Sequence, residues 1–194
     1  RLDLLVLTHF HDDHANGVVQ LLRRVEVDAL AIPDVDQENP VRQEILDQAA
    51  ERGTRVLFVR TDTALELEGG RTLRLIAPLG SGDTNEEGLT VLLDQEGLRT
   101  LITGDMGADV EELLLAHVQL PETQVLVAGH HGSRYSTSQA LLDRTGPAYA
   151  LISVGEDNLY GHPAQETLER IAAAGAEIYR TDVSGTVTVQ INET

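Results

Sequence analysis

Short apolar runs alternate along the chain with longer segments in which apolar residues recur every three or four positions. The short runs have the length of β-strands, and the longer segments have the period of helices that bury one face. Gly53, Gly146 and Gly175 each follow a helical segment, where a left-handed cap is expected. We therefore predict strands at residues 2–8, 28–32, 55–60, 72–77, 89–94, 98–103, 124–129, 148–154, 176–180 and 186–191, and helices at 17–25, 41–52, 109–118, 136–145 and 164–174. This order of elements predicts a mixed α/β fold with helices layered over sheets.

The composition narrows the class of protein. The 194 residues are 41% apolar and include no cysteine, and no apolar run is long enough to span a membrane. We expect one domain that covers residues 1–194, and any metal in it must be bound by nitrogen and oxygen atoms because thiolates are absent. The formal net charge is −18, and all 14 basic residues are arginine. An acidic surface does not attract polyanions, which argues against a nucleic-acid substrate unless metal ions reverse the field at the site.

Three of the seven histidines lie in the segment LTHFHDDH, residues 7–14, directly after the first predicted strand. Histidines so close together would repel one another when protonated, so a structural role in the core is unfavourable. A solvated polar loop is the simpler alternative. Because residues two apart in an extended loop project to the same side, His9 and His11 can share one ion, while Asp13 and His14 can turn toward a second. Imidazole and carboxylate groups are ligands of Zn²⁺, Mn²⁺ and Fe²⁺, so the spacing predicts a metal site.

Further candidate ligands follow two other predicted strands. Asp105 comes directly after the strand at 98–103, in the segment TGDMG, and His130 and His131 follow the strand at 124–129, in AGHHGS. Either segment alone would usually be an ordinary turn. Since all these residues lie at the carboxyl ends of strands, we expect them to meet at one edge of a sheet.

These segments together resemble a known family. THFHDDH matches the His-x-His-x-Asp-His signature of the metallo-β-lactamase superfamily. The segments TGD, HHGS, SVGEDNLYGHP and YRTDVSGTVTV are similar to the C-terminal domain of ComEC-type competence proteins, the DNA-uptake channels of bacteria. The resemblance extends in order over essentially the whole chain. It implies an αββα sandwich, a hydrolase centre with two divalent metal ions, either zinc or manganese, and a role in degrading the DNA strand that is not imported.

The resemblance also implies a role for each matching residue. The implied metal ligands are His9 and His11 for one ion, Asp13 and His14 for the other, Asp105 as the bridge, and His131, favoured over His130, to complete the set. For catalysis we expect Asp13 or Asp105 to orient the attacking water and His130 or His162 to protonate the leaving group. His162 could equally be only a residue at the start of a helix, before Pro163, or a phosphate contact. A histidine ligand usually needs a hydrogen-bonding partner behind it, and Asp182 is a candidate for this position.

The chain departs from the family pattern in two places. Many family members have another histidine ligand in the loop that here reads GSGDTNEEG, and this loop offers only Asp83, Asn85 and glutamates. We therefore expect one ion to be held more weakly than the other. The first strands of the family fold would precede Arg1, so we expect part of one sheet to be missing from this fragment.

The sequence thus predicts a dinuclear metal-dependent hydrolase, a phosphodiesterase or nuclease domain of a ComEC-type DNA-uptake protein. Its substrate would be DNA or another phosphodiester, and the domain would be attached to a bacterial membrane channel, on a side of the membrane that the sequence does not specify. One alternative is a small-molecule hydrolase that acts on an ester, a lactam or a phosphocholine-like group, which the acidic charge favours slightly. Another is a non-catalytic module with a vestigial metal site, which the missing loop histidine favours slightly.

Overall fold

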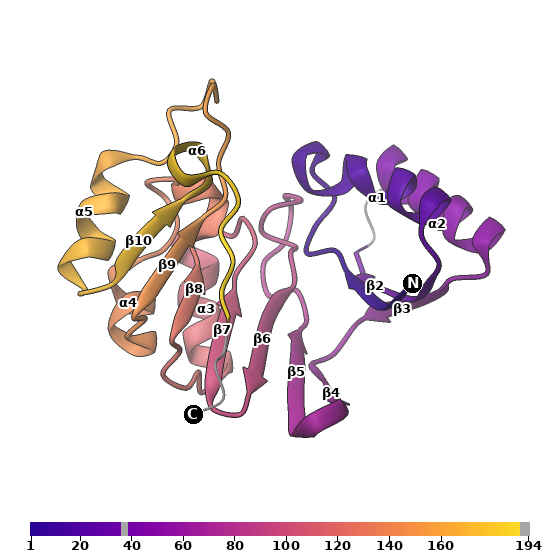
Figure 1. The fold of residues 1–194 in the computed structure, drawn as a ribbon, viewed down its shortest axis with the longest axis horizontal. Helices are drawn as coiled ribbons and strands as arrows, with labels where there is room; N and C mark the ends of the chain where they lie inside the picture. The colour runs from indigo at the N-terminus through magenta and orange to yellow at the C-terminus, as the bar shows by residue number, and fades with distance from the viewer. Residues whose placement is uncertain (36–38, 191–194) are drawn as a thin grey trace.

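The computed structural model describes residues 1–35 and 39–190, and it arranges them as two β-sheets that face each other, with helices on their outer sides (Figure 1). This is the mixed α/β sandwich that the sequence predicts. Within the described residues, no helix is long and apolar enough to cross a membrane.

The smaller sheet has three parallel strands in the order β1-β2-β3. These strands are β1 (Leu2–Val6), β2 (Val27–Pro33) and β3 (Arg55–Val59), and helices α1 (Asp12–Arg24) and α2 (Pro40–Arg52) cover one face of the sheet. In β1, Leu5 packs toward the helices while Leu4 and Val6 pack toward the other sheet. A strand that is covered on both faces is apolar throughout, which explains the unbroken apolar run before the histidine segment.

The larger sheet has seven strands in the order β10-β9-β8-β7-β6-β5-β4. Its strands are β4 (Thr63–Leu67), β5 (Arg71–Ile76), β6 (Thr90–Gln95), β7 (Leu98–Ile102), β8 (Val125–Val127), β9 (Tyr149–Ile152) and β10 (Glu177–Arg180). The strands from β7 to β10 are parallel, whereas β4 to β7 are antiparallel. The hairpin predicted between residues 89–94 and 98–103 is therefore confirmed as β6 and β7.

Three helices pack on the outer face of the larger sheet. They are α3 (Ala108–His117), α4 (Gln139–Thr145) and α5 (Gln165–Ala173), and they share one buried apolar cluster with β6 to β9. A second cluster lies between the two sheets, where Ala31 and Val59 meet Leu73, Leu75 and Val91. The two sheets are thus held face to face by apolar contacts, which brings the carboxyl ends of β1 and β7 toward each other.

Several predicted boundaries need correction. The first helix begins at Asp12 and not at residue 17, because Asp12 and Asp13 form its first turn, where carboxylates are favourable near the positive end of the helix dipole. The fourth helix begins at Gln139 and not at residue 136, because the Ser138 side chain caps it by accepting a hydrogen bond from the Leu141 amide.

Two further elements differ from the prediction. Strand β4 was not predicted, because it is a largely exposed edge strand whose sequence TALEL lacks a continuous apolar run. The strand predicted at 186–191 is wrong over its described part, since residues 186–190 form no strand and residue 191 lies outside the described residues. Val187–Gln190 instead line a groove with Tyr149 and Tyr179 on the larger sheet. Short helix α6 (Thr181–Ser184) was also not predicted.

The segment Gly129–Ser138, which carries His130 and His131, is held in place by a buried carboxylate and a partly buried guanidinium from two helices. The carboxylate of Glu111 in α3 accepts the backbone N–H groups of Thr137 at 2.5 Å and Ser138 at 2.7 Å. Arg170 in α5 donates to the carbonyl groups of Ser136 and Thr137. Burial raises the pKa of Glu111 even though the hydrogen bonds from Ser138 and Thr137 oppose this shift.

We predict that Glu111→Ala destabilises the protein by about 2–4 kcal/mol, because two buried backbone N–H groups lose their acceptor. Urea unfolding at pH 7 measures the change. The neighbouring exposed Glu112 supplies a matched control, and Glu112→Ala is expected to change the free energy of unfolding by less than about 0.5 kcal/mol. Equal effects of the two substitutions would show that Glu111 does not anchor the segment.

Candidate metal centre

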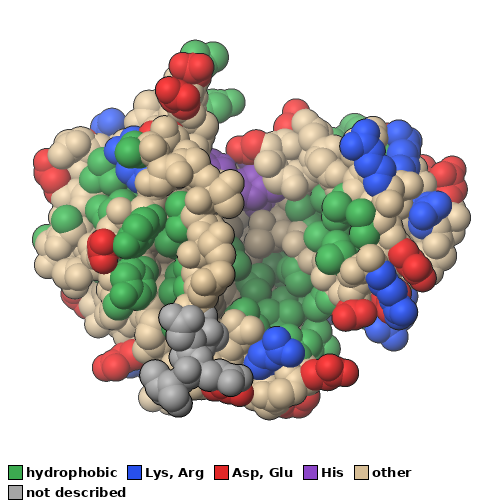
Figure 2. All heavy atoms as spheres, viewed as in Figure 1, with side chains coloured by type: hydrophobic (Ala, Val, Ile, Leu, Met, Phe, Trp, Pro, Cys, Tyr) green, Lys and Arg blue, Asp and Glu red, His purple; other side chains and the backbone are tan. Residues whose placement is uncertain are grey.

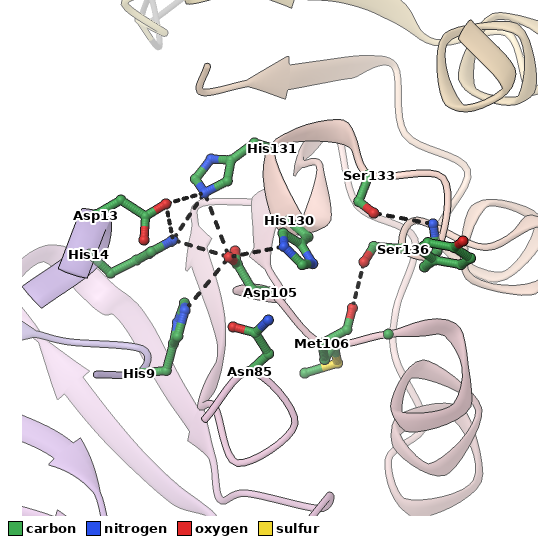
Figure 3. A network of polar contacts seen from close by, with 12 residues as sticks. His9, Asp13, His14, Asn85, Asp105, Met106, His130, His131, Ser133 and Ser136 are labelled. Carbon is green, nitrogen blue, oxygen red and sulfur yellow. Dashed lines mark hydrogen bonds and ion pairs between the residues drawn. The ribbon is translucent and has the colours of Figure 1, made fainter. Parts of the chain in front are cut away.

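Polar side chains from both sheets converge at the carboxyl ends of the strands (Figure 3). His9 and His11 follow β1, Asp105 follows β7, and His130 and His131 lie in the short helix η2 (Gly129–Gly132) that follows β8. In the space-filling view, histidine side chains lie in the hollow between the two halves of the molecule (Figure 2). The structure thus brings together residues that are more than one hundred positions apart in the sequence.

Asp105 occupies the middle of this cluster. Its side chain is only 4% exposed, and four imidazole groups surround its Oδ2 atom. The distances from Oδ2 to the Nε2 atoms are 3.3 Å for His14, 3.6 Å for His9, 3.6 Å for His131 and 4.0 Å for His130. A single carboxylate oxygen therefore faces histidines from both halves of the sandwich.

The candidate ligand atoms form two groups that share Asp105. The first site consists of His9, His11 and Asp105, and the second site consists of Asp13, His14, Asp105 and His131. Within each group, one potential ligand atom of every residue lies within 4.8 Å of the others. These are the residues that the resemblance assigns to two ions. His130 belongs to neither group, so His131 has the geometry of the ligand among the two adjacent histidines.

Local backbone structure aims these side chains. Asp13 and His14 lie on the first turn of α1, whereas His9 and His11 lie before the helix, and the His14 ring packs 4.1 Å from the ring of His9 between centroids. His130 and His131 both have left-handed backbone angles, with φ of 49° and 54°. Such angles are uncommon outside glycine and persist only where the surroundings enforce them. The backbone of η2 is therefore fixed in a strained conformation that turns both rings toward Asp105.

The hydrogen bonds of His131 indicate that a cation fits the second site. Its Nδ1 atom lies 2.7 Å from the carbonyl oxygen of Ser153, which can only accept, so Nδ1 carries the proton. In the neutral ring, the lone pair of Nε2 then faces the Asp13 carboxylate at 3.1 Å and the His14 ring nitrogen at 3.2 Å. Lone pairs at these distances need a proton or a cation among them, and a cation bound there would have the usual arrangement of a metal site with a carbonyl group behind the ligand.

The first site shows the same need for a cation. His9 is 1% exposed, and its Nε2 atom is buried without a hydrogen-bond partner, whereas its Nδ1 atom lies 3.1 Å from the Thr8 hydroxyl. Burial, followed by the proximity of His14, lowers the pKa of His9 to about 4. The neutral imidazole therefore predominates at neutral pH, and this is the form that binds metals.

The charges of the remaining groups are also set by their surroundings. Burial alone would raise the pKa of Asp105, but the interaction with His14, together with His9 and His131, lowers it to about 2. Burial alone would lower the pKa of His14, but Asp105 and Asp13 raise it. Asp105 is thus a carboxylate at any pH at which the protein would work.

A cavity of about 360 Å³ opens beside the second site. Asp13 and His131 form one part of its wall, and Asn158, Tyr160 and His162 form another. The His162 ring packs against the ring of His130 at a centroid distance of 5.6 Å. The three candidate catalytic residues, Asp13, His130 and His162, therefore lie at or next to the cavity.

The group that supports a ligand histidine from behind differs from the one that the sequence suggests. Asp182 contacts no histidine, because its carboxylate pairs with the Arg180 guanidinium. The group behind His131 is instead the backbone carbonyl of Ser153, at the carboxyl end of β9. A backbone acceptor has no side-chain signature, so the sequence held no signal for it.

The chain is similar over most of its length to parts of curated bacterial proteins. It is 29% identical over 189 residues to ComE operon protein 3 of Bacillus subtilis, and the aligned region covers 96% of this chain and 24% of that protein. It is also 29% identical over 186 residues to competence protein ComA of Neisseria gonorrhoeae, and this alignment covers 95% of this chain and 25% of that protein. Both relatives are competence proteins of the ComEC type. The chain spans about a quarter of their length.

The fold is shared with solved structures of low sequence identity. CmlA, a diiron β-hydroxylase from Streptomyces venezuelae, superposes with a TM-score of 0.65 at 16% identity, over 93% of this chain and 44% of that one. Tm1679, described as a metal-dependent hydrolase of the beta-lactamase superfamily, has a TM-score of 0.54 at 13% identity, over 90% of this chain and 75% of that one. A family model described as the metallo-β-lactamase superfamily matches residues 1–156. With its two ligand groups joined at Asp105 and this match over most of its length, the chain belongs to the metallo-β-lactamase superfamily.

Proposed function

We propose that this chain is a dinuclear metal-dependent phosphodiesterase, the nuclease domain of a ComEC-type DNA-uptake protein. The observation that carries the proposal is the pair of ligand groups that share the buried Asp105 carboxylate beside an open cavity. His9, His11 and Asp105 would hold one divalent ion, and the second site would hold another. When bound, two such ions supply an activated water at neutral pH and neutralise the charge of a phosphoryl group.

The residues of the cavity wall are placed to act on a bound substrate. Asp13 is 59% exposed in its side chain and belongs to both the second site and the cavity, so it can orient a water molecule between them. Asn158 fixes the backbone of His162 in both directions, since its amide donates to the His162 carbonyl at 2.7 Å and its oxygen accepts the His162 N–H at 3.0 Å. These two hydrogen bonds fix the backbone from which the His162 ring extends.

The His162 ring is also supported from one side. Tyr160 stacks on it with a centroid distance of 6.1 Å and an interplanar angle of 17°. Across the ring, His130 makes an edge contact. In this proposal His162, with His130 beside it, would supply a proton to the departing oxygen of a substrate bound in the cavity.

The similarity to competence proteins supports DNA as the substrate and a DNA-uptake channel as the larger assembly. We propose that residues 1–194 form one hydrolase domain of such a bacterial membrane protein. The net charge of −18 opposes binding of a polyanion at long range. Two divalent ions would carry about four positive charges into the cleft, which reverses the sign of the field where the phosphodiester binds.

The acidic surface also favours a second candidate, a hydrolase of small esters or lactams. A cavity of about 360 Å³ has the size of an ordinary small-molecule site. The two candidates differ in whether the site accepts a polymeric phosphodiester.

We predict that the purified protein nicks supercoiled plasmid DNA only when a divalent metal is present. Dialysis against a chelator should abolish nicking, and stepwise addition of Mn²⁺ or Zn²⁺ should restore it, because nitrogen and oxygen ligands without thiolate do not select strongly between these ions. A parallel assay with a nitrophenyl ester and a β-lactam distinguishes the alternative. Metal-dependent hydrolysis of these small substrates without any nicking would contradict the nuclease proposal.

We further predict that His162→Ala leaves metal binding intact and lowers turnover by about 10²–10⁴-fold, as expected for the loss of a proton donor. Metal content per chain and the rate of plasmid nicking are the two measurements. His117→Ala is the matched control, because this histidine lies on α3 and pairs with Asp62 at 3.1 Å, away from the cavity. Loss of metal in His162→Ala would make His162 a ligand, and an unchanged rate would remove it from the mechanism.

A further inference from the structure

The loop between β5 and β6 lies against the first site. The Leu89 N–H donates to the Thr8 carbonyl at 2.9 Å, which ties the end of this loop to the residue before His9. A methyl group added to Gly88 would lie 3.2 Å from the Asn85 carbonyl oxygen and 3.7 Å from the His9 Cβ. A side chain at this position would be tight against the Asn85 carbonyl, and the loop places the backbone of Asn85 and the Cβ of His9 on the same side of Gly88.

The conformation of Asn85 is fixed from within the loop. Its backbone N–H donates to the Asp83 carboxylate at 2.9 Å, and the Glu87 N–H donates to the Asp83 carbonyl at 3.0 Å. Asp83 thus organises a turn around Asn85, as aspartate commonly does in loops. The Asn85 side chain points toward Asp105 and lies between His9 and His130 (Figure 3).

The amide oxygen of Asn85 has no hydrogen-bond partner among residues 1–35 and 39–190. Asn85 Oδ1 is buried and makes no hydrogen bond to this part of the chain, and the same is true of His9 Nε2. A buried acceptor without a partner costs about 1–3 kcal/mol, so each of these two atoms calls for an explanation. An amide oxygen does not become protonated at ordinary pH, which leaves a cation or a water molecule to satisfy it.

From this geometry we propose that Asn85 is a metal ligand, with its amide oxygen as the fourth donor of the first site beside His9, His11 and Asp105. The inference rests on the proposed two-ion centre and specifies its chemistry. Each site then has two imidazole nitrogens and two oxygens, but the first has one carboxylate and a neutral amide where the second has two carboxylates. Carbonyl oxygens suit Mn²⁺, whereas an additional imidazole would favour Zn²⁺.

Glu87 is the other group of this loop with an unpartnered buried atom, its Oε2. Its second oxygen accepts the Gly82 N–H at 3.0 Å, and the residue lines a small hollow with His9, Phe10 and Val35 that does not include Asp105. Glu87 is therefore the rival ligand from the same loop, and its substitution must be compared with that of Asn85.

The test is calorimetric titration of the chelator-treated protein with Mn²⁺ and with Zn²⁺, for the wild type and the variants Asn85→Leu, Asn85→Asp and Asn85→His. Leucine keeps the size of asparagine but has no donor atom, and aspartate restores an oxygen. We expect two ions in the wild type, at least tenfold weaker binding of one Mn²⁺ in Asn85→Leu, and two ions again in Asn85→Asp. Asn85→His should shift the preference of that site toward Zn²⁺ by at least tenfold.

The outcomes separate this inference from the proposed function. Glu87→Leu removes the rival donor and should leave both affinities unchanged, whereas loss of an ion in this variant but not in Asn85→Leu would overturn the assignment to Asn85. The thermal midpoint of each metal-free variant controls for folding. Two ions bound by Asn85→Leu with wild-type affinities would overturn the assignment and leave a water molecule as the partner of Asn85. An unchanged metal preference in Asn85→His would also overturn it, even if the leucine variant failed to fold. A wild type that binds fewer than two ions would instead refute the two-ion centre itself.

Discussion

The buried carboxylate of Asp105 is the group on which the rest of the centre depends. Taking a charged carboxylate out of water costs several kcal/mol unless the surrounding groups compensate for it. Here the compensation comes from imidazole groups of four histidines, which reach it from the loop after β1, from α1 and from η2. Because these elements belong to both sheets, a single charge links the two halves of the sandwich at the place where a substrate would bind.

This arrangement gives the two candidate sites unequal chemistry. The first site is buried around His9 and closed by the loop that carries Asn85, whereas the second site borders the cavity through Asp13 and His131. An ion in the second site would therefore be next to a substrate in the cavity. An ion in the first site would lie farther from the cavity, on the other side of Asp105. The shared carboxylate couples the two, so a change in the occupancy of one site alters the field at the other.

Most of the fold, and the grouping of the candidate ligands, follow from patterns that are local in the sequence. The spacing of His9, His11, Asp13 and His14 and the strands before Asp105 and His131 were sufficient to place these residues at one edge, although ion binding itself stays a prediction. The sequence pattern does not predict edge strand β4 or the course of residues 186–190, because both depend on contacts with residues elsewhere in the chain. Asn85 could not be singled out in its polar loop, since its isolation from other partners exists only in the folded protein.

The central claim is that Asp105 serves two ions at once, and the metal content of Asp105→Ala tests it most directly. Asp109→Ala, an exposed neighbour at the start of α3, is the control. After equilibration with Mn²⁺ and removal of free metal, elemental analysis should find two ions per chain in the wild type and in Asp109→Ala, and none in Asp105→Ala. One tightly bound ion remaining in Asp105→Ala would show that the sites are independent and would contradict the account.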